Sequence, residues 1–236
     1  MKIYVATAFP AILSGALKES ILKRAQEREQ VAIKIFDLRD FTSDKHRQVD
    51  DYPYGGGAGM ILKPEPFFRA VQHIKTTEKL VHPDIILMTP QGKTYNQAKA
   101  KELSQKQELI FLCGHYKGVD ERVSEYLATE EISIGDYILT GGELAALVVI
   151  DSLVRLLPDV VGDFDSVKSD SFEDGMLDCP YYTRPENLNG MIVPQVLLSG
   201  HHAEIEKWRK QQSLERTRQR RRDLLKTTEE FITQEP

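Results

Sequence analysis

Short apolar runs separated by helical stretches give the N-terminal part of this chain its organisation. Residues 84–89 and 108–113 are compact, almost wholly apolar and bounded by turn residues, whereas residues 3–9 and 31–38 are rich in β-branched and aromatic side chains. Such runs predict strands, and the two compact ones suit strands buried on both faces. Strands that alternate with helices indicate an α/β architecture with a largely parallel sheet.

Helical patterns fill the intervals between these strands. Pro10 suits a helix start, and apolar residues then recur at helical spacing from residue 12 to residue 21. Helical stretches are also predicted around residues 66–74 and 97–103. Residues 143–157 form a helix that is apolar on nearly all sides and ends before Pro158. Such a helix is buried in a core or against a partner subunit.

The composition narrows the class of protein. With 41% hydrophobic and 28% charged residues, the chain reads as an ordinary globular protein, and no window approaches the roughly 20 continuous apolar residues of a membrane span. The N-terminal strand pattern leaves no room for a signal peptide. Cys113 and Cys179 are the two cysteines, and neither has a paired metal spacing, so we expect no disulfide framework and no metal site. These features predict a cytoplasmic protein.

Charge is distributed unevenly along the chain. The net charge is −5, yet residues 207–226 hold nine Lys or Arg and two acidic residues, a local balance of +7 that leaves −12 for the remainder. A concentrated basic element on an acidic body is typical of proteins that contact nucleic-acid phosphates. A solvated helix face would show the same pattern, so charge alone leaves both interpretations open.

The C-terminal third of the chain changes character. Residues 162–178 contain six acidic residues and one base, which predicts a mobile acidic linker. Loop-forming Pro, Asn and Gly residues follow over residues 181–196, and a helical, basic sequence begins at residue 203. The predicted organisation is therefore an α/β domain over residues 1–161, the linker 162–178, and a small, mainly helical domain over residues 179–236.

Three segments rich in glycine are candidates for ligand contact. Residues 54–60 fit neither the P-loop nor the dinucleotide fingerprint, so they indicate only a close backbone approach or positive φ angles. Gly114 directly follows a buried strand, where ligands bind in open α/β sheets. Residues 132–143 alternate apolar with small residues and end in Gly141-Gly142 at a helix start, which could hold a flat heterocycle. Each segment alone could equally be a structural turn.

Taken together, the motifs are far more specific. They are Thr89-Pro-Gln-Gly92, Cys113-Gly-His-Tyr116, Gly118-Val-Asp-Glu-Arg-Val123, Ser133-Ile-Gly-Asp-Tyr137, Gly141-Gly-Glu143, Asp170-Ser-Phe172, Leu177-Asp-Cys-Pro180, Tyr182-Thr-Arg-Pro185 and Leu198-Ser-Gly-His201. In this order they resemble the bacterial tRNA (guanine-N(1))-methyltransferases of the knotted SPOUT superfamily. The resemblance extends over almost the whole chain.

The resemblance implies a fold, a methyl donor and a set of donor-binding residues. The fold is a parallel-sheet α/β domain with a deep trefoil knot, a feature too rare to be proposed from sequence patterns. The donor is S-adenosylmethionine, and magnesium is a further candidate cofactor. The residues carried over to the donor site are Pro90, Gly114, Ile134, Gly135, Asp136, Tyr137, Ile138, Leu139, Gly141 and Gly142.

The chemistry of the implied reaction needs a base and a cation. Guanine N1 carries a proton that must leave before N1 is a good nucleophile, and negative charge then builds on the neighbouring keto oxygen. By resemblance, Asp170 is the general base and Arg155 the cation, and the methylated guanosine is the one immediately 3′ of the anticodon. From the residues alone, Asp170 could be a helix cap and Arg155 a surface residue at a helix end.

Two positions depart from the usual family pattern. Lys117 stands where an acid is usual, and Ser169 precedes Asp170 where Glu is usual. Lys117 reverses a charge beside the predicted donor pocket, which could weaken binding of the cationic donor or alter a magnesium dependence. It is the one feature that favours a catalytically silent RNA-binding homologue. A knotted RNA methyltransferase of other site specificity is the second alternative.

The resemblance also implies partners. A homodimer with shared active sites would provide a partner for the apolar helix, and the anticodon arm of tRNA would meet the basic C-terminal region. The target base must leave its stack to present N1. The predicted RNA-binding residues are Arg209, Arg216, Arg218, Arg220, Arg221 and Arg222.

Overall fold

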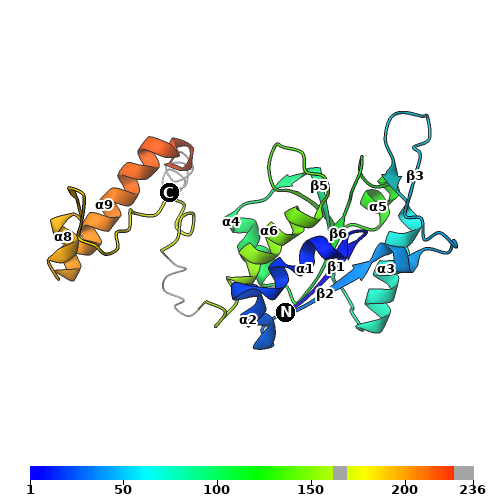
Figure 1. The fold of residues 1–236 in the computed structure, drawn as a ribbon, viewed down its shortest axis with the longest axis horizontal. Coiled ribbons are helices and arrows are strands. Elements are labelled where there is room, and N and C mark those ends of the chain that lie inside the picture. The colour runs from blue at the N-terminus through cyan, green and yellow to red at the C-terminus, as the bar shows by residue number, and fades with distance from the viewer. Residues whose placement is uncertain (162–168, 226–236) are drawn as a thin grey trace, which may run out of the picture. The chain divides into compact units, whose positions relative to one another are not determined.

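The computed structural model describes residues 1–161 and 169–225 of the chain (Figure 1). It divides into two compact units, Met1–Gly162 and Asp163–Pro236. Of the predicted linker 162–178, residues 162–168 lie outside the described residues, as do residues 226–236 of the predicted C-terminal domain.

A five-stranded parallel sheet forms the centre of the first unit. Its strands are β1 (Lys2–Thr7), β2 (Ala32–Asp37), β5 (Asp84–Thr94), β6 (Glu108–Cys113) and β7 (Glu130–Ser133). They pair in the order β2-β1-β6-β5-β7, and every one of these pairings is parallel. The predicted α/β architecture with a parallel sheet is confirmed; the knot stays a prediction.

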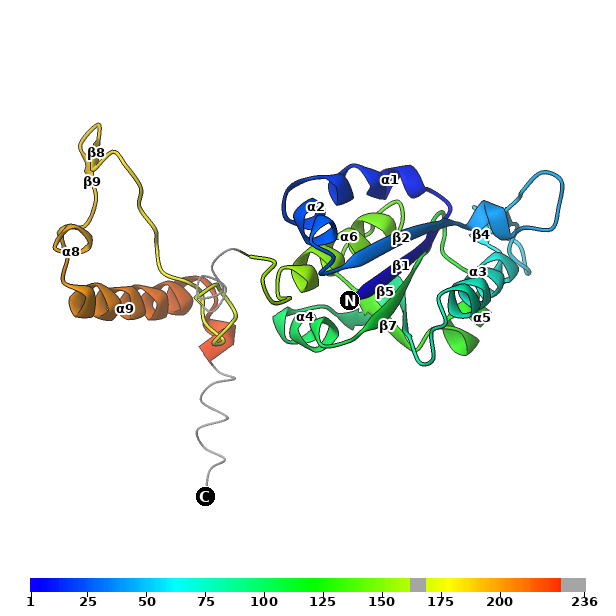
Figure 2. The ribbon, with the colours of Figure 1, turned by 90° about the horizontal axis from the view of Figure 1, so that it is seen from below.

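Helices cover both faces of this sheet, as the edge-on view shows (Figure 2). On one face lie α1 (Pro10–Ser14), α2 (Ser20–Glu27), α4 (Gln97–Ser104) and α6 (Glu143–Val154). On the other lie α3 (Pro64–Thr77) and α5 (Glu121–Tyr126). Alternate side chains of β1 enter the two cores, with Ile3 and Val5 in one and Tyr4 and Ala6 in the other, as the period of a strand requires.

The helix predicted from residue 10 to residue 21 is wrong in its continuity. The chain instead forms α1, a single 3-10 turn η1 (Ala16–Lys18) and then α2. Glu19 is extended, at φ −126° and ψ 158°, and Ser20 has a positive φ of 49°, so the backbone cannot continue as one helix. The apolar stripe persists across the break because both pieces pack on the same face of the sheet.

Helix α6 ends three residues earlier than predicted, at Val154, with Arg155 as its C-cap. One side of it is core, where Ala146, Val149 and Ile150 are fully buried. Leu144 and Val148 are each 49% exposed on the chain considered alone. The core side of the predicted helix is therefore confirmed, and burial of Leu144 and Val148 against a partner subunit stays a prediction.

The remaining elements of the described residues are two short hairpins, the 3-10 turn η2 and the helices α8 and α9. In the first unit β3 (Asp50–Asp51) pairs with β4 (Ile61–Leu62), and η2 (Leu38–Phe41) follows β2. Between β3 and β4, the φ angles of Gly55, Gly56, Gly57 and Gly59 are 81°, 78°, 120° and 95°. Glycine adopts such positive φ angles without strain, which explains why the 54–60 segment is rich in glycine. The second unit contains the hairpin β8 (Asn187–Leu188) and β9 (Met191–Ile192), then α8 (Gln195–Leu198) and α9 (His202–Arg220), so the mainly helical C-terminal part is confirmed.

Candidate active site

Three loops meet at the carboxyl edge of the central sheet. Two of them follow β6 and β7, and the third is the irregular part of β5 after Met88, where its register with β7 shifts. Because these strands are parallel, their carboxyl ends share one edge. Together with the start of α6, the loops line a cavity of about 380 Å³. Segments far apart in the sequence therefore form one concave surface, as expected for a ligand site in an open α/β sheet.

Close backbone approach explains the glycines of this cavity. A Cβ atom on Gly142 would lie 3.1 Å from Cys113 Cα and 3.2 Å from Gly114 N, and the Gly142 amide donates to Gly114 O at 2.8 Å. Gly135 has a φ of 140°, and a Cβ there would lie 2.7 Å from Tyr137 Cε1. Larger residues at either position would push the loops apart and change the shape of the cavity.

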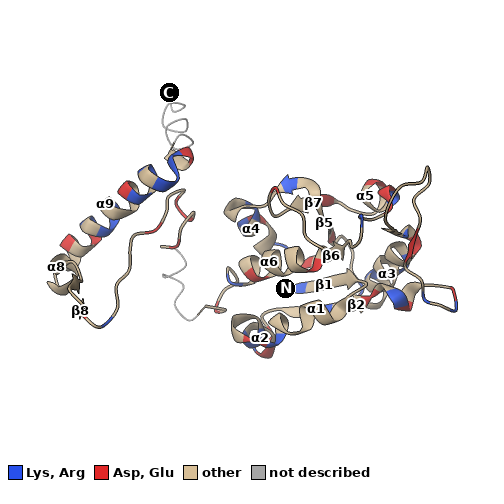
Figure 3. Ribbon diagram, turned by 45° about the horizontal axis from the view of Figure 1, so that its top comes forward, with Lys and Arg blue, Asp and Glu red and all other residues tan. Residues whose placement is uncertain are grey.

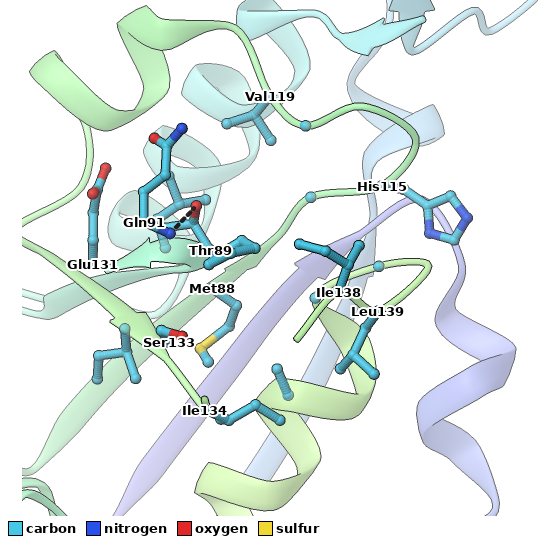
Figure 4. Close-up of a pocket in the computed structure, with 18 of the residues that line it drawn as sticks. Met88, Thr89, Gln91, His115, Val119, Glu131, Ser133, Ile134, Ile138 and Leu139 are labelled. Carbon is cyan, nitrogen blue, oxygen red and sulfur yellow. Dashed lines mark hydrogen bonds between the residues drawn. The ribbon is translucent and has the colours of Figure 1, made fainter. Parts of the chain in front are cut away.

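The cavity has apolar walls with a few polar groups. Met88 of β5 and Ile134, Ile138 and Leu139 of the loop after β7 contribute the apolar side chains, with Ser133 among the polar ones (Figure 4). Of the ten predicted donor-binding residues, every one except Asp136 lines this cavity; Asp136 is exposed beside it. The walls suit a flat heterocycle, and the loop amides and carbonyls suit its polar edges.

A buried polar cluster that the sequence analysis did not identify lies at the start of α6. The Glu143 carboxylate is 1% exposed and accepts a hydrogen bond from Thr7 Oγ1 at 2.6 Å. Its other oxygen lies 3.6 Å from Nδ1 of His115, a buried atom without a hydrogen-bond partner among the described residues. A Cβ on Gly141 would collide with both Glu143 Oε2 and His115 Nδ1, so only glycine lets them approach.

This cluster affects the chemistry beneath the cavity. Burial, and then the Glu143 carboxylate, raises the pKa of the Cys113 thiol well above its usual value, which keeps the sulfur protonated and unreactive. His115 also packs its ring 4.1 Å from that of Phe9. The one available sequence signal was Glu143 in the Gly-Gly-Glu motif; nothing linked it to Thr7, which is 136 positions away.

Lys117 lines the same cavity and is exposed. Its amide donates to Met60 O at 3.1 Å, and a Cβ on Gly59 would lie 3.7 Å from Lys117 Cβ. The glycine-rich 54–60 segment therefore packs beside the loop after β6, through Lys117, and does not itself line the cavity. The charge reversal noted in the sequence thus falls at the rim of the candidate site.

The two predicted catalytic residues belong to different units. Arg155 is half-buried and caps the C-terminal end of α6 in the first unit. Asp170 is half-buried in the second unit, where it shares a cavity of about 280 Å³ with Arg209 and Lys210 of α9. Leu177 is hydrogen-bonded to Thr217 and Ser213 of α9, and Ser169 lines the same cavity as Asp170. The described part of the predicted linker is therefore a loop beside α9.

Basic residues recur along α9 with acidic residues between them (Figure 3). Arg209, Arg218, Arg220 and Arg222 are exposed and open to phosphate contact, and Arg216 is half-buried. Arg221 differs from them because its guanidinium pairs with Asp223 at 2.7 Å and lies 5.7 Å from the centre of the Phe172 ring. The predicted RNA-binding set therefore contains one arginine with a structural contact to the loop that carries Asp170.

Over residues 1–161 and 169–225, no group of three or more His, Cys, Asp or Glu side chains is arranged to hold a metal ion. No helix in that part of the chain is long and apolar enough to cross a membrane.

Comparisons with known proteins identify the family. The family model of the tRNA (guanine-1)-methyltransferase TrmD matches residues 1–227. A tRNA (guanine-N(1)-)-methyltransferase of Anoxybacillus flavithermus is 57% identical over 97% of this chain and 93% of its own length. The corresponding proteins of Halalkalibacterium halodurans and Clostridioides difficile are 55% and 48% identical, over 98% of this chain and 94% and 100% of their own lengths. With the motifs of its first unit gathered at one edge of a parallel sheet, the chain belongs to the tRNA (guanine-1)-methyltransferase TrmD family.

Proposed function

We propose that this protein transfers a methyl group from S-adenosylmethionine to N1 of the guanosine immediately 3′ of the anticodon of tRNA. The observation that carries the proposal is the cavity at the carboxyl edge of the sheet, which is lined by the same loops that hold the family motifs. We place the reaction in the cytoplasm, where tRNA is modified.

The donor would lie in that cavity and supplies an activated methyl group. Gly114, Gly135 and Gly142 allow the backbone to approach it closely, and the side chains of Ile134 and Leu139 exclude water from its faces. Magnesium as a further cofactor stays a prediction. The chain's own residues would contribute positioning and electrostatic stabilisation.

Asp170 and Arg155 would act on the target base. As N1 forms its bond to the methyl carbon and the carbon–sulfur bond breaks with its electron pair on sulfur, the Asp170 carboxylate accepts the N1 proton. The Arg155 guanidinium stabilises the negative charge that develops on the keto oxygen next to N1. The base is delivered flipped from its stack, and arginines of α9 hold the phosphates around it.

A homodimer would complete this arrangement. Its support is the apolar strip on α6, where Leu144 and Val148 are each 49% exposed while the opposite side of the helix is core. An exposed apolar strip on an otherwise buried helix is typical of an oligomer interface. The second copy of the chain would cover this strip and bring its own Asp170 or Arg155 to a shared site.

The Asp170→Asn variant tests the proposed base. An amide has nearly the shape of the carboxylate but cannot accept the N1 proton, so we expect S-adenosylmethionine binding to stay close to wild type and methyl transfer to be lost. The measurements are equilibrium donor binding, with and without tRNA, and single-turnover transfer. A variant that keeps most of the wild-type single-turnover rate would exclude Asp170 as the general base. Wild-type protein that binds donor and tRNA without transfer would instead identify a silent homologue.

A further inference from the structure

The loop that carries Asp170 is hydrogen-bonded to α9 through the backbone of one residue, Leu177. The Leu177 amide donates to Thr217 Oγ1 at 2.9 Å, and the Leu177 carbonyl accepts from Ser213 Oγ at 2.6 Å. Thr217 in turn donates to the Ser213 carbonyl at 2.8 Å. Both polar groups of Leu177 are thus satisfied by two hydroxyls one turn apart on the same face of the helix.

The hydroxyl that accepts from the Leu177 amide belongs to a buried residue. Thr217 is 0% exposed, and it is the one residue of α9 that is buried. The bond from the Leu177 amide to this hydroxyl is partly buried, so its loss would leave the amide only partly compensated by water. The Thr217 hydroxyl is therefore the point at which a small change would release the loop from α9.

Hydrogen bonds within the loop connect Leu177 to Asp170. Asp178 N, next to Leu177, donates to Ser171 Oγ at 3.0 Å, and Phe172 N donates to Met176 O at 2.7 Å. Glu173 N donates to the Asp170 carbonyl at 3.2 Å. The backbone position of Asp170 thus depends on where Leu177 is held.

Arg221 supplies a second fastening at the end of α9. Its guanidinium lies 5.7 Å from the centre of the Phe172 ring, a cation–π contact, and pairs with Asp223 at 2.7 Å. Phe172 has a φ of 75°, an arrangement that a bulky residue adopts only where surrounding contacts hold it. The loop therefore contacts α9 at two points. Phe172 contacts Arg221 just after the helix ends, and Leu177 is hydrogen-bonded to Thr217 and Ser213 within it.

We propose that Thr217 and Ser213, aided by Arg221, are positioning residues that set the Asp170 loop from the RNA-binding helix. The proposal rests on the proposed function, in which Asp170 is the base and arginines of α9 contact phosphates. The helix that binds the RNA phosphates then also determines where the Asp170 carboxylate lies relative to guanine N1. None of these three residues needs to touch the reacting atoms.

Thr217→Val tests the proposal, since valine has the shape of threonine without the hydroxyl. We expect single-turnover methyl transfer to fall by about tenfold, with the tRNA and donor dissociation constants within about twofold of wild type. Hydrogen exchange of the Leu177 and Phe172 amides should accelerate. Thr217→Ser restores the hydroxyl and should recover both the rate and the protection.

Thr76→Val is the matched control. The Thr76 hydroxyl donates to Gln72 O at 2.8 Å on α3, the same bond four residues back that Thr217 makes, but in the other unit and exposed. This variant should leave transfer and exchange of the loop unchanged. Should Thr217→Val fail to fold, Ser213→Ala removes the other hydroxyl from an accessible position and should give the same pattern.

The outcomes separate this proposal from the proposed function. Wild-type transfer and exchange in both Thr217→Val and Ser213→Ala would overturn it, as would tRNA affinity that falls in step with the rate. If Asp170→Asn proves active while Thr217→Val still speeds exchange and slows transfer, the loop is positioned by α9 but carries a different catalytic group.

Discussion

Thr7→Val is the sharpest test of the buried cluster beneath the candidate donor site. The change removes a hydroxyl that is 0% exposed and donates to Glu143 at 2.6 Å, while accepting from the Phe9 amide at 2.8 Å. A hydrogen bond to a charged group contributes about 1.5–3 kcal/mol and a neutral one about 1 kcal/mol. We therefore expect the free energy of unfolding to fall by about 3 kcal/mol.

The assay is equilibrium urea unfolding, with thermal unfolding beside it. For a domain of this size a loss of about 3 kcal/mol corresponds to a melting temperature lowered by roughly 6–12 °C. Thr7→Ser keeps the hydroxyl and loses one methyl group, which costs about 1 kcal/mol, so it is the matched control. If Thr7→Val is as stable as Thr7→Ser, the Glu143 carboxylate is not held by this bond and the reasoning is refuted.

Three further predictions concern assembly, RNA contact and the role of Arg221. Mixing Asp170→Asn subunits with Gly135→Trp subunits, whose donor cavity is blocked at a glycine with a φ of 140°, should regenerate active sites if these are shared between protomers; a monomeric mass at micromolar concentration would count against this. Replacing Arg220, Arg221 and Arg222 together by Ala should weaken tRNA binding and flatten its log–log salt dependence by somewhat under one unit per lost contact, with donor binding unchanged. Superimposable salt curves for the triple variant and wild type would mean that these arginines do not touch RNA. Arg221→Ala alone should slow methyl transfer more than it weakens tRNA binding, because Arg221 contacts the Phe172 ring.

The sheet was predictable where its strands are buried on both faces. Residues 85–88 and 109–113 are almost all apolar because helices cover both sides of β5 and β6. The edge strand β7 escaped prediction, since its four residues include two glutamates and show no alternation. Helix α5 was missed because six residues are too few for a helical period to stand out.

The sequence predicted the loops that line the candidate site, but not the long-range hydrogen bonds that hold its residues in place. Glycines that follow apolar runs indicate where backbone must approach a ligand, and the structure brings those loops together at one cavity. The Thr7–Glu143 bond joins residues 136 positions apart, and no periodicity records such a contact. Likewise, acidic composition suggested a mobile segment around Asp170, whereas two hydroxyls of α9 hold the described part of it. Composition reports solvation, but not a partner elsewhere in the chain.

Mass mapping of methylated nucleosides tests the central claim most directly. Unmodified tRNA would be incubated with the protein and S-adenosylmethionine, digested, and sequenced by fragment mass. We expect one added methyl group, on N1 of the guanosine immediately 3′ of the anticodon, and none with Asp170→Asn. Methylation of a ribose 2′ oxygen or of another nucleotide, or no methylation despite binding of donor and tRNA, would contradict the account.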